Sequence, residues 1–186
     1  YESASGFSDA VHKLLGTSPG AVAGEPLLAT LFESPLGPLL AVTDADSVCL
    51  LEFADRRMLE TQIQGLRMRL DAPVIPGRNA VTDRLETELG EYFSGERRQF
   101  EVPLRIEGTD FQESVWRALI EVPYGQTASY GDLAKTIERP TAVRAVANAN
   151  GDNRLAILIP CHRIVGSDGS LTGYGGGLWR KRRLLD

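Results

Sequence analysis

From residue 27 onward, the chain begins with short apolar stretches separated by turn residues. This pattern predicts β-strands. The stretches at 27–34, 39–43 and 48–53 are divided by short segments rich in proline, glycine and aspartate. Segments of this kind form tight turns, which join neighbouring strands in opposite directions. The sequence therefore predicts a three-stranded antiparallel meander.

Apolar residues then recur every three or four positions, which is the period of a helix with one buried face. This spacing predicts a helix at 56–70 with Asp55 as its N-cap, a short strand or extended link at 72–76, and a helix at 80–93. Cys49 lies inside the third apolar stretch, and we interpret it as a core residue. Because this half shows no cluster of polar or nucleophilic side chains, we interpret it as scaffold.

The second half begins with a predicted crossing strand at 102–106 and continues mainly as helices. The predicted helices run from Asp110 to Val122, over 130–137 with Thr127 or Ser129 as cap, over 142–149 with Thr141 as cap, and over 178–185, which is basic. A tight turn at 138–140 joins the two middle helices. Two short helices joined in this way predict a helix-turn-helix, whose second helix would enter a groove of DNA.

The predicted second helix, 142–149, carries mostly alanine and valine, and Arg144 is its one long side chain. A helix that reads a specific sequence usually projects Arg, Asn or Gln toward base edges. Small side chains instead let the backbone approach DNA while reading little sequence. The alternative is that the alanines only permit tight helix packing.

Composition and charge narrow the class of protein. The 186 residues carry a net charge of -5, with -7 in residues 1–107 and +2 in residues 108–186, so the basic excess accompanies the helix-turn-helix. No apolar run approaches the roughly 20 residues that cross a membrane, and no secretory leader is visible. The two cysteines lie far apart and show no paired metal-ligand spacing. We expect a cytoplasmic protein without a disulfide framework, a metal or a cofactor.

The candidate chemistry lies in the stretch Ile-Leu-Ile-Pro-Cys-His-Arg at 157–163. The apolar residues predict one buried strand that Pro160 ends, and the turn after it could bring Cys161 and His162 into one pocket. A histidine within hydrogen-bond reach can generate a thiolate near neutral pH, which predicts a nucleophilic cysteine. The alternative is a small buried hydrophobic residue beside a surface histidine.

The wider segment 159–165, Ile-Pro-Cys-His-Arg-Ile-Val, resembles the active-site motif of the O6-alkylguanine-DNA alkyltransferases. Asn153 precedes the cysteine by eight residues, and Thr-Gly-Tyr-Gly-Gly-Gly-Leu follows it at 172–178. The resemblance covers 28–186. It implies an α+β (or α/β) fold: a small antiparallel sheet with helices in a ribonuclease H-like half, 27–102, and then a winged-helix-like half, 103–186, that carries the helix-turn-helix.

The resemblance also implies what the protein does. The protein would remove the alkyl group from O6-alkylguanine, and from O4-methylthymine, in double-stranded DNA by irreversible transfer to its own Cys161, once per molecule. His162 would act as base through a water, Asn153 would brace the turn, and Arg144 would fill the stack left by a flipped base. The expected catalytic residues are Cys161, His162, Asn153 and Tyr130; the expected DNA-binding residues are Arg144, Tyr130, Gly131, Arg139 and Ser167; and the expected substrate-pocket residues are Tyr174, Gly175, Gly176 and Trp116. The protein is expected to act as a monomer, away from membranes.

The sequence departs from the family pattern at two positions, and a second resemblance concerns its first 20 residues. Some family members carry Ser at the position of Gly175, and the family's Glu that orients the histidine would fall just beyond Asp186. Residues 1–20 resemble the last part of an AraC-type DNA-binding domain, with 21–26 as linker, which implies the C-terminal part of an Ada-type adaptive-response regulator. A tag or an isolated amphipathic helix is the alternative for 1–20. For the whole chain, the alternatives are a non-catalytic lesion-binding alkyltransferase-like protein and a protein that is mainly a transcriptional regulator.

Overall fold

The computed structural model of the chain describes residues 25–186. The predicted AraC-type remnant, 1–20, and most of the predicted linker, 21–26, lie outside the described residues. No helix within the described range is long and apolar enough to span a membrane.

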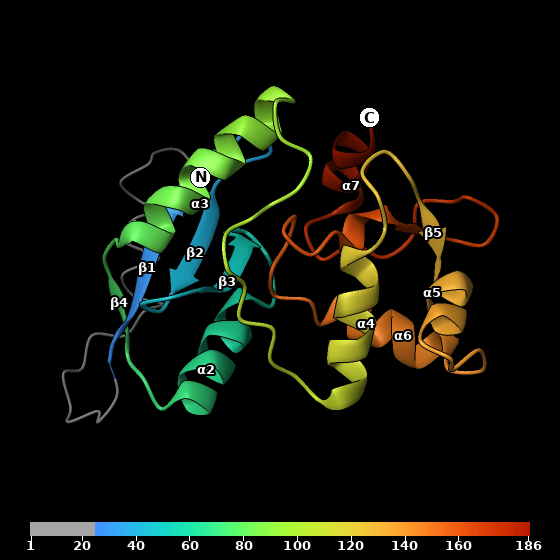
Figure 1. The fold of residues 1–186 in the computed structure, drawn as a ribbon, viewed down its shortest axis with the longest axis horizontal. Helices are drawn as coiled ribbons and strands as arrows, with labels where there is room; N and C mark the ends of the chain where they lie inside the picture. Colours follow the sequence, from blue (N-terminus) through green and yellow to red (C-terminus); the bar gives the residue numbers. More distant parts are fainter. Residues whose placement is uncertain (1–24) are drawn as a thin grey trace.

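A four-stranded sheet forms the centre of the N-terminal half (Figure 1). Strands β1 (Leu27–Phe32), β2 (Leu39–Thr43) and β3 (Val48–Phe53) pair antiparallel, which confirms the predicted meander. The segment after the first helix supplies strand β4 (Val74–Pro76), which pairs parallel to β1, so the sheet order is β3-β2-β1-β4. The sheet is therefore mixed rather than purely antiparallel.

Helices α2 (Leu59–Leu70) and α3 (Ala80–Ser94) cover opposite faces of this sheet (Figure 1). Alternate side chains of β2 separate accordingly: Leu40 and Val42 pack in the cluster that contains α2, whereas Leu39 and Ala41 pack in the cluster that contains α3. This separation follows from the two-residue period of a strand.

The predicted start of the first helix is wrong. Helix α2 begins at Leu59, three residues later than expected, and Met58 occupies the N-cap position. Asp55 does not cap the helix, because its carboxylate accepts hydrogen bonds from the Arg180 guanidinium at 2.8 and 2.9 Å. A local capping rule does not foresee a partner 125 residues away.

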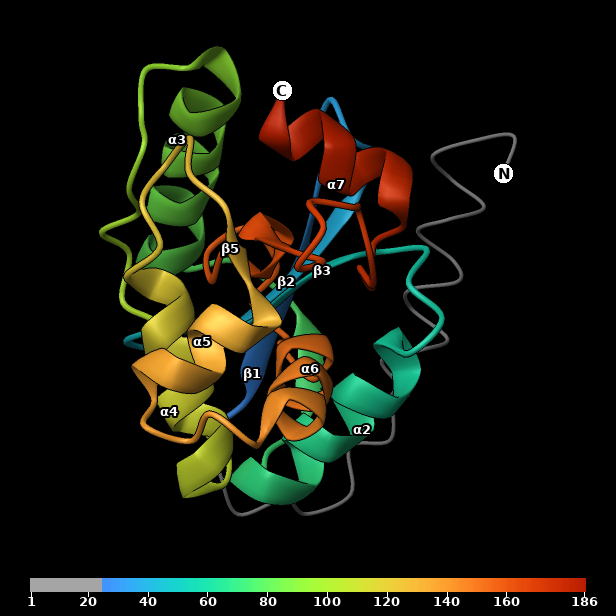
Figure 2. The same ribbon diagram turned by 90° about the vertical axis from the view of Figure 1, so that its right-hand side faces the viewer.

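The C-terminal half groups helices α4 (Asp110–Ile120), α5 (Tyr130–Thr136) and α6 (Val143–Gly151) (Figure 2). Helix α7 (Leu178–Leu185) lies apart from these three and contacts the turn at Cys161–Arg163. Capping boxes at Thr109 and Ser129 start α4 and α5, so Ser129 and not Thr127 is the cap. Thr141 does not cap α6: Ala142 takes the N-cap position without a side-chain hydrogen bond.

Two predicted strands are not regular strands. The segment 102–106 makes a single parallel bridge, Leu104 to Val48, which ties it to the edge of β3. The run 157–159 is buried but forms a tight turn, in which Ile157 has a φ of +72°. An unpredicted pair of two-residue strands, β5 (Ala128–Ser129) and β6 (Ile164–Val165), holds the start of α5 beside the segment that follows the cysteine.

One apolar cluster runs from the α3 face of the sheet into the C-terminal half. It contains Phe53 and Leu85 from the first half together with Val115, Leu155 and Cys161 from the second. A chain with segregated sheet and helices around shared apolar packing is an α+β fold, as predicted. Residues of both halves therefore meet around Cys161.

Candidate active site

A cavity of about 170 Å³ opens where the two halves meet, and Cys161 lines it. The N-terminal half contributes Glu52 and Arg56 to its wall. The C-terminal half contributes the end of α6, the turn before the cysteine and the glycine-rich loop. These lining residues are Tyr130, Ala147, Asn150, Gly151, Asn153, Ala156, Gly173, Tyr174, Gly175 and Gly176.

Asn153 shapes the turn that carries the thiol. Its side-chain nitrogen donates to the Ile159 carbonyl at 3.0 Å and to the Cys161 sulfur at 3.2 Å, and its side-chain oxygen accepts from the Leu155 N–H at 2.9 Å. Pro160 then leads into a 3₁₀ turn, Cys161–Arg163. The expected role of Asn153 as a brace agrees with these contacts.

Burial raises the pKa of Cys161 to about 11, while the hydrogen bond from Asn153 acts in the opposite direction. The thiol is therefore protonated at neutral pH, and attack on an alkyl carbon requires the removal of its proton.

His162 is fully buried, so the alternative of a surface histidine is wrong. Its ring lies edge-on to Tyr174, with the ring centroids 6.5 Å apart, and it is not part of the cavity wall. Neither ring nitrogen has a hydrogen-bond partner among residues 25–186, so the direct Cys161–His162 contact is not formed. Burial and then the charges of Arg163 and Lys181 lower the pKa of His162 to about 3. The imidazole is neutral at pH 7, which is the form that can accept a proton.

The glycine-rich loop closes against side chains of the N-terminal half. A Cβ atom at Gly175 would lie 2.6 Å from the Arg56 guanidinium carbon, and one at Gly176 would lie 2.6 Å from the Phe53 ring. Tyr174 packs edge-on to Phe53 at 6.4 Å. A side chain at position 176 would therefore collide with a packed ring, whereas one at position 175 would require only the end of the Arg56 side chain to shift.

Two residues of the basic last helix point inward, which the sequence did not indicate. Lys181 is fully buried and donates to the carbonyls of Ile164 and Thr172, the latter at 2.5 Å. Arg180 donates to the Gly176 carbonyl at 2.9 Å as well as to Asp55. A run of basic residues ordinarily indicates a solvated face, but here half of it fixes the loops around the cavity.

The ion pair of Glu52 and Arg56 was also missed. Glu52 is fully buried, although it lies in an apolar strand, and Arg56 binds it while donating to the carbonyls of Gly151 and Asn153. A lone carboxylate inside an apolar stretch was the available signal, because a buried charge requires a partner.

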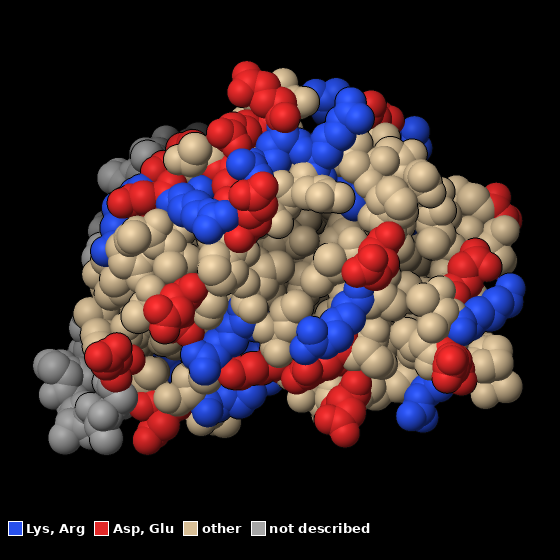
Figure 3. Space-filling view, viewed as in Figure 1, with Lys and Arg blue, Asp and Glu red and all other residues tan. Residues whose placement is uncertain are grey.

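The expected DNA-binding residues are exposed or half-buried. Arg144, Arg139 and Ser167 are exposed, and Tyr130 and Gly131 are half-buried at the start of α5. Of these five, Tyr130 lines the cavity. On the face drawn in Figure 3, acidic and basic side chains are interspersed rather than gathered by sign.

Trp116, expected in the substrate pocket, lies instead in the core. It is almost fully buried, its indole N–H donates to the Ala149 carbonyl at 2.8 Å, and it is not part of the cavity wall. Its large apolar ring therefore supports the packing of α4 against α6.

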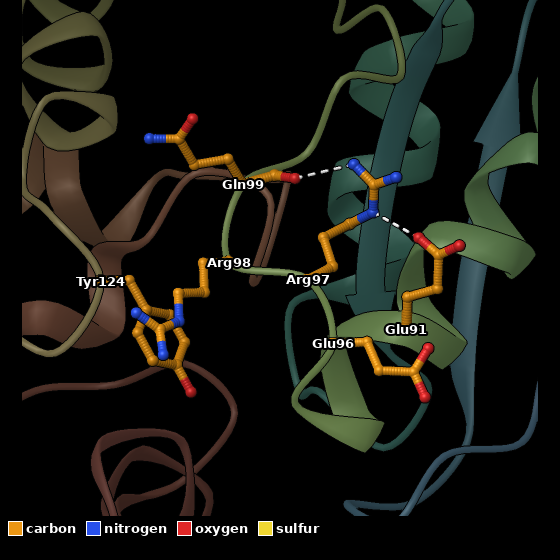
Figure 4. A pocket seen from close by; sticks show the side chains of 6 residues that line it. All are labelled: Glu91, Glu96, Arg97, Arg98, Gln99 and Tyr124. Carbon is orange, nitrogen blue, oxygen red and sulfur yellow. Dashed lines mark hydrogen bonds and ion pairs between the residues drawn. The ribbon is translucent and has the colours of Figure 1, made fainter.

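A second, wider depression of about 770 Å³ lies between the end of α3 and the segment after α4 (Figure 4). Arg98 stacks on Tyr124, with 5.7 Å between the guanidinium carbon and the ring centroid, and Arg97 donates to Glu91 at 2.7 Å. It holds no cysteine or histidine. The chemistry therefore belongs to the smaller cavity at Cys161.

Comparisons with known proteins agree with this geometry. Residues 110–186 match the family profile described as 6-O-methylguanine DNA methyltransferase, DNA binding domain. A methylated-DNA–protein-cysteine methyltransferase from Mycobacterium tuberculosis is 45% identical over 154 residues, which cover 83% of this chain and 87% of the relative. One from Methanosarcina acetivorans is 42% identical over 156 residues, with 83% and 94% covered.

Solved structures show the same likeness. A crystal structure of the M. tuberculosis O6-methylguanine methyltransferase superposes with a TM-score of 0.73 at 40% identity, covering 86% of this chain and 90% of that one. A second crystal structure, the M. tuberculosis OGT in complex with DNA, gives a TM-score of 0.71 at 41% identity, with 83% and 88% covered.

Proposed function

The chain belongs to the family of methylated-DNA–protein-cysteine methyltransferases, which repair O6-methylguanine in DNA, and we propose that Cys161 is the cysteine that takes the methyl group. The observation that carries this assignment is the cavity, where Cys161 is the one cysteine in the wall and Asn153 holds its sulfur. The other cysteine, Cys49, packs in the separate cluster beneath α2, and burial raises its pKa to about 12.

The transfer step involves two buried groups that are neutral at pH 7, the Cys161 thiol and the His162 imidazole. By the family resemblance, His162 accepts the thiol proton through a bridging water. Its ring is unprotonated at rest, and the burial that lowers its pKa opposes this transfer rather than assisting it. The sulfur attacks the alkyl carbon, the bond between that carbon and O6 breaks, and its electron pair leaves with guanine. The product is a thioether, which has no ready hydrolysis route, so each molecule acts once.

The modified base must leave the duplex to reach this cavity, and such extrusion costs a few kcal/mol. Helix α6 supports this step, since its last turns line the cavity while Arg144 is exposed on the same helix. Arg144 fills the vacated stack, and Tyr130 lies at the cavity mouth beside the phosphate. Arg139, Gly131 and Ser167 supply further contacts to the DNA backbone.

Substrate range and regulation are supported by the family resemblance. Acceptance of O4-methylthymine rests on it, as does the Ada-type assignment, whose AraC-like segment lies outside the described residues. A cytoplasmic location agrees with two free cysteines, and the monomeric state is proposed from the resemblance alone. The retained cysteine argues against a non-catalytic lesion binder.

The test uses a duplex with one O6-methylguanine inside a restriction site that the methyl group blocks. Excess protein restores cleavage, Cys161→Ser abolishes the restoration, and Cys49→Ser retains it. Restoration by Cys161→Ser would overturn the assignment of the acceptor.

A further inference from the structure

Arg56 joins four parts of the site at once. It binds Glu52, and it donates to the Asn153 carbonyl at 3.1 Å and to the Gly151 carbonyl at 2.7 Å. Its guanidinium also lies where a side chain at position 175 would extend. Glu52 and Arg56 both line the cavity that holds Cys161. The pair comes from β3 and the turn after it, in the half that carries no other part of the transfer chemistry.

The two carbonyls belong to the turn that places the Asn153 side chain against the sulfur. Residues 151–153 end α6, and the Asn153 side chain donates to the Cys161 sulfur. A guanidinium that binds two carbonyls of this turn fixes the turn from outside, and a planar fork does so better than a point charge. Arg56 therefore acts on the sulfur through Asn153.

We propose that Arg56, held by Glu52, is a positioning residue for alkyl transfer that fixes the Asn153 turn and, opposite Gly175, forms the wall of the base pocket. This inference rests on the proposed function of Cys161. Arg56 also occupies the space into which a side chain at position 175 would extend, so any residue larger than glycine there requires Arg56 to shift.

Because Glu52 and Arg56 are charged, substituting either one should change the apparent pKa of Cys161. A purely structural role of the pair would not predict opposite changes for the two residues. Glu52 and Arg56 act on the Cys161 thiol in opposite directions, the carboxylate disfavouring the thiolate and the guanidinium favouring it. Lys181, the other cation that acts on the thiol, is unchanged in either variant.

The first experiment measures single-turnover methyl transfer from duplex O6-methylguanine at saturating protein. Arg56→Ala and Arg56→Lys are both expected to lower the rate constant at least tenfold without weakening binding to undamaged duplex, because Lys keeps the charge but not the fork. Full-rate transfer by Arg56→Lys would overturn the positioning role. Thermal unfolding of each variant shows that it is folded; if Arg56→Ala is not, Arg56→Lys and Glu52→Gln carry the test.

The second experiment measures the pH dependence of Cys161 alkylation by iodoacetamide, in a Cys49→Ala background. Arg56→Lys is expected to keep the apparent pKa close to that of the parent or raise it, Arg56→Ala to raise it, and Glu52→Gln to lower it. Shifts of the same sign for Arg56→Ala and Glu52→Gln would mean that the pair only supports folding, and would contradict the proposal.

The third experiment is a double-mutant cycle between positions 56 and 175. Gly175→Ala is expected to slow transfer in the wild-type background, because the new methyl group meets Arg56, and to add little loss to Arg56→Ala. Gly90→Ala is the matched control, since a Cβ at that helical position meets nothing within 4 Å. Additive losses would overturn the proposed packing of Arg56 against Gly175. If the wild-type protein itself transferred no methyl group, the proposed function would fail instead.

Discussion

Removal of the Asn153 side chain tests the architecture of the site most fully. Asn153 is almost entirely buried, and Asn153→Ala leaves the Leu155 N–H without its partner, whereas the Ile159 carbonyl keeps the Cys161 N–H as donor. Each orphaned buried group costs about 1–3 kcal/mol. We therefore expect the free energy of unfolding to fall by about 2 kcal/mol, and Tm by about 4–8 °C for a domain of this size.

The same substitution removes the donor to the Cys161 sulfur at 3.2 Å. A hydrogen bond to a charged group contributes about 1.5–3 kcal/mol, so the thiolate should become about tenfold to a hundredfold scarcer at a given pH. Asn153→Asp separates the two effects, because its carboxylate can still accept from Leu155 but cannot donate to the sulfur.

Thermal unfolding and the pH profile of Cys161 alkylation measure these two consequences. Asn148→Ala serves as control, because Asn148 is exposed on α6, just before the turn that contains Asn153. If Asn153→Ala unfolded within a degree or two of the wild type and kept the same alkylation profile, Asn153 would neither brace the turn nor act on the sulfur.

Three further predictions concern single side chains. His162 has a pKa of about 3 in the folded protein and 6.5 as its reference value, so the unfolded state binds the extra proton between these values. Above about pH 6.5 His162 is unprotonated in both states and does not reduce the free energy of unfolding. As the pH drops from there toward 3, the free energy of unfolding falls by about 1.4 kcal/mol per pH unit. Urea unfolding at several pH values should show this slope, and His162→Gln should flatten it. Arg144→Ala should slow transfer from duplex DNA about tenfold to a hundredfold, and transfer from free O6-alkylguanine base much less, because a lost stacking contact is worth about 1–3 kcal/mol; equal losses would make it structural. Lys181→Met should destabilise the protein by about 2 kcal/mol in urea, since the buried Ile164 carbonyl and the part-buried Thr172 carbonyl lose this donor, whereas the exposed Arg182→Met should not.

The elements predicted best are continuous apolar runs and helices with one apolar face. The strands at 39–43 and 48–53 are buried throughout, the helix at 80–93 buries one face, and the structure has all three within a residue or two. The motif around Cys161 predicted the candidate site in part, because Cys161 and Asn153 line one cavity whereas His162 lies outside its wall.

The features that escaped prediction depend on contacts between distant segments. Arg56 meets Asn153 across 97 residues, and Asp55 meets Arg180 across 125, so no local pattern announces either pair. The run 157–159 reads as a strand, yet the Asn153 side chain and the bridge from Leu155 to Leu51 hold it as a turn with Ile157 at positive φ. Tertiary packing thus overrides the local preference of a β-branched residue.

The central claim is that Cys161 accepts the methyl group and keeps it. Intact mass and peptide mass should be measured after the protein is incubated with an excess of duplex containing O6-methylguanine. We expect each protein molecule to gain the mass of one methyl group, located on the peptide that contains Cys161, with Cys49 unmodified and no further repair after that point. A methyl group on another residue, or several repaired duplexes per protein molecule, would contradict the account.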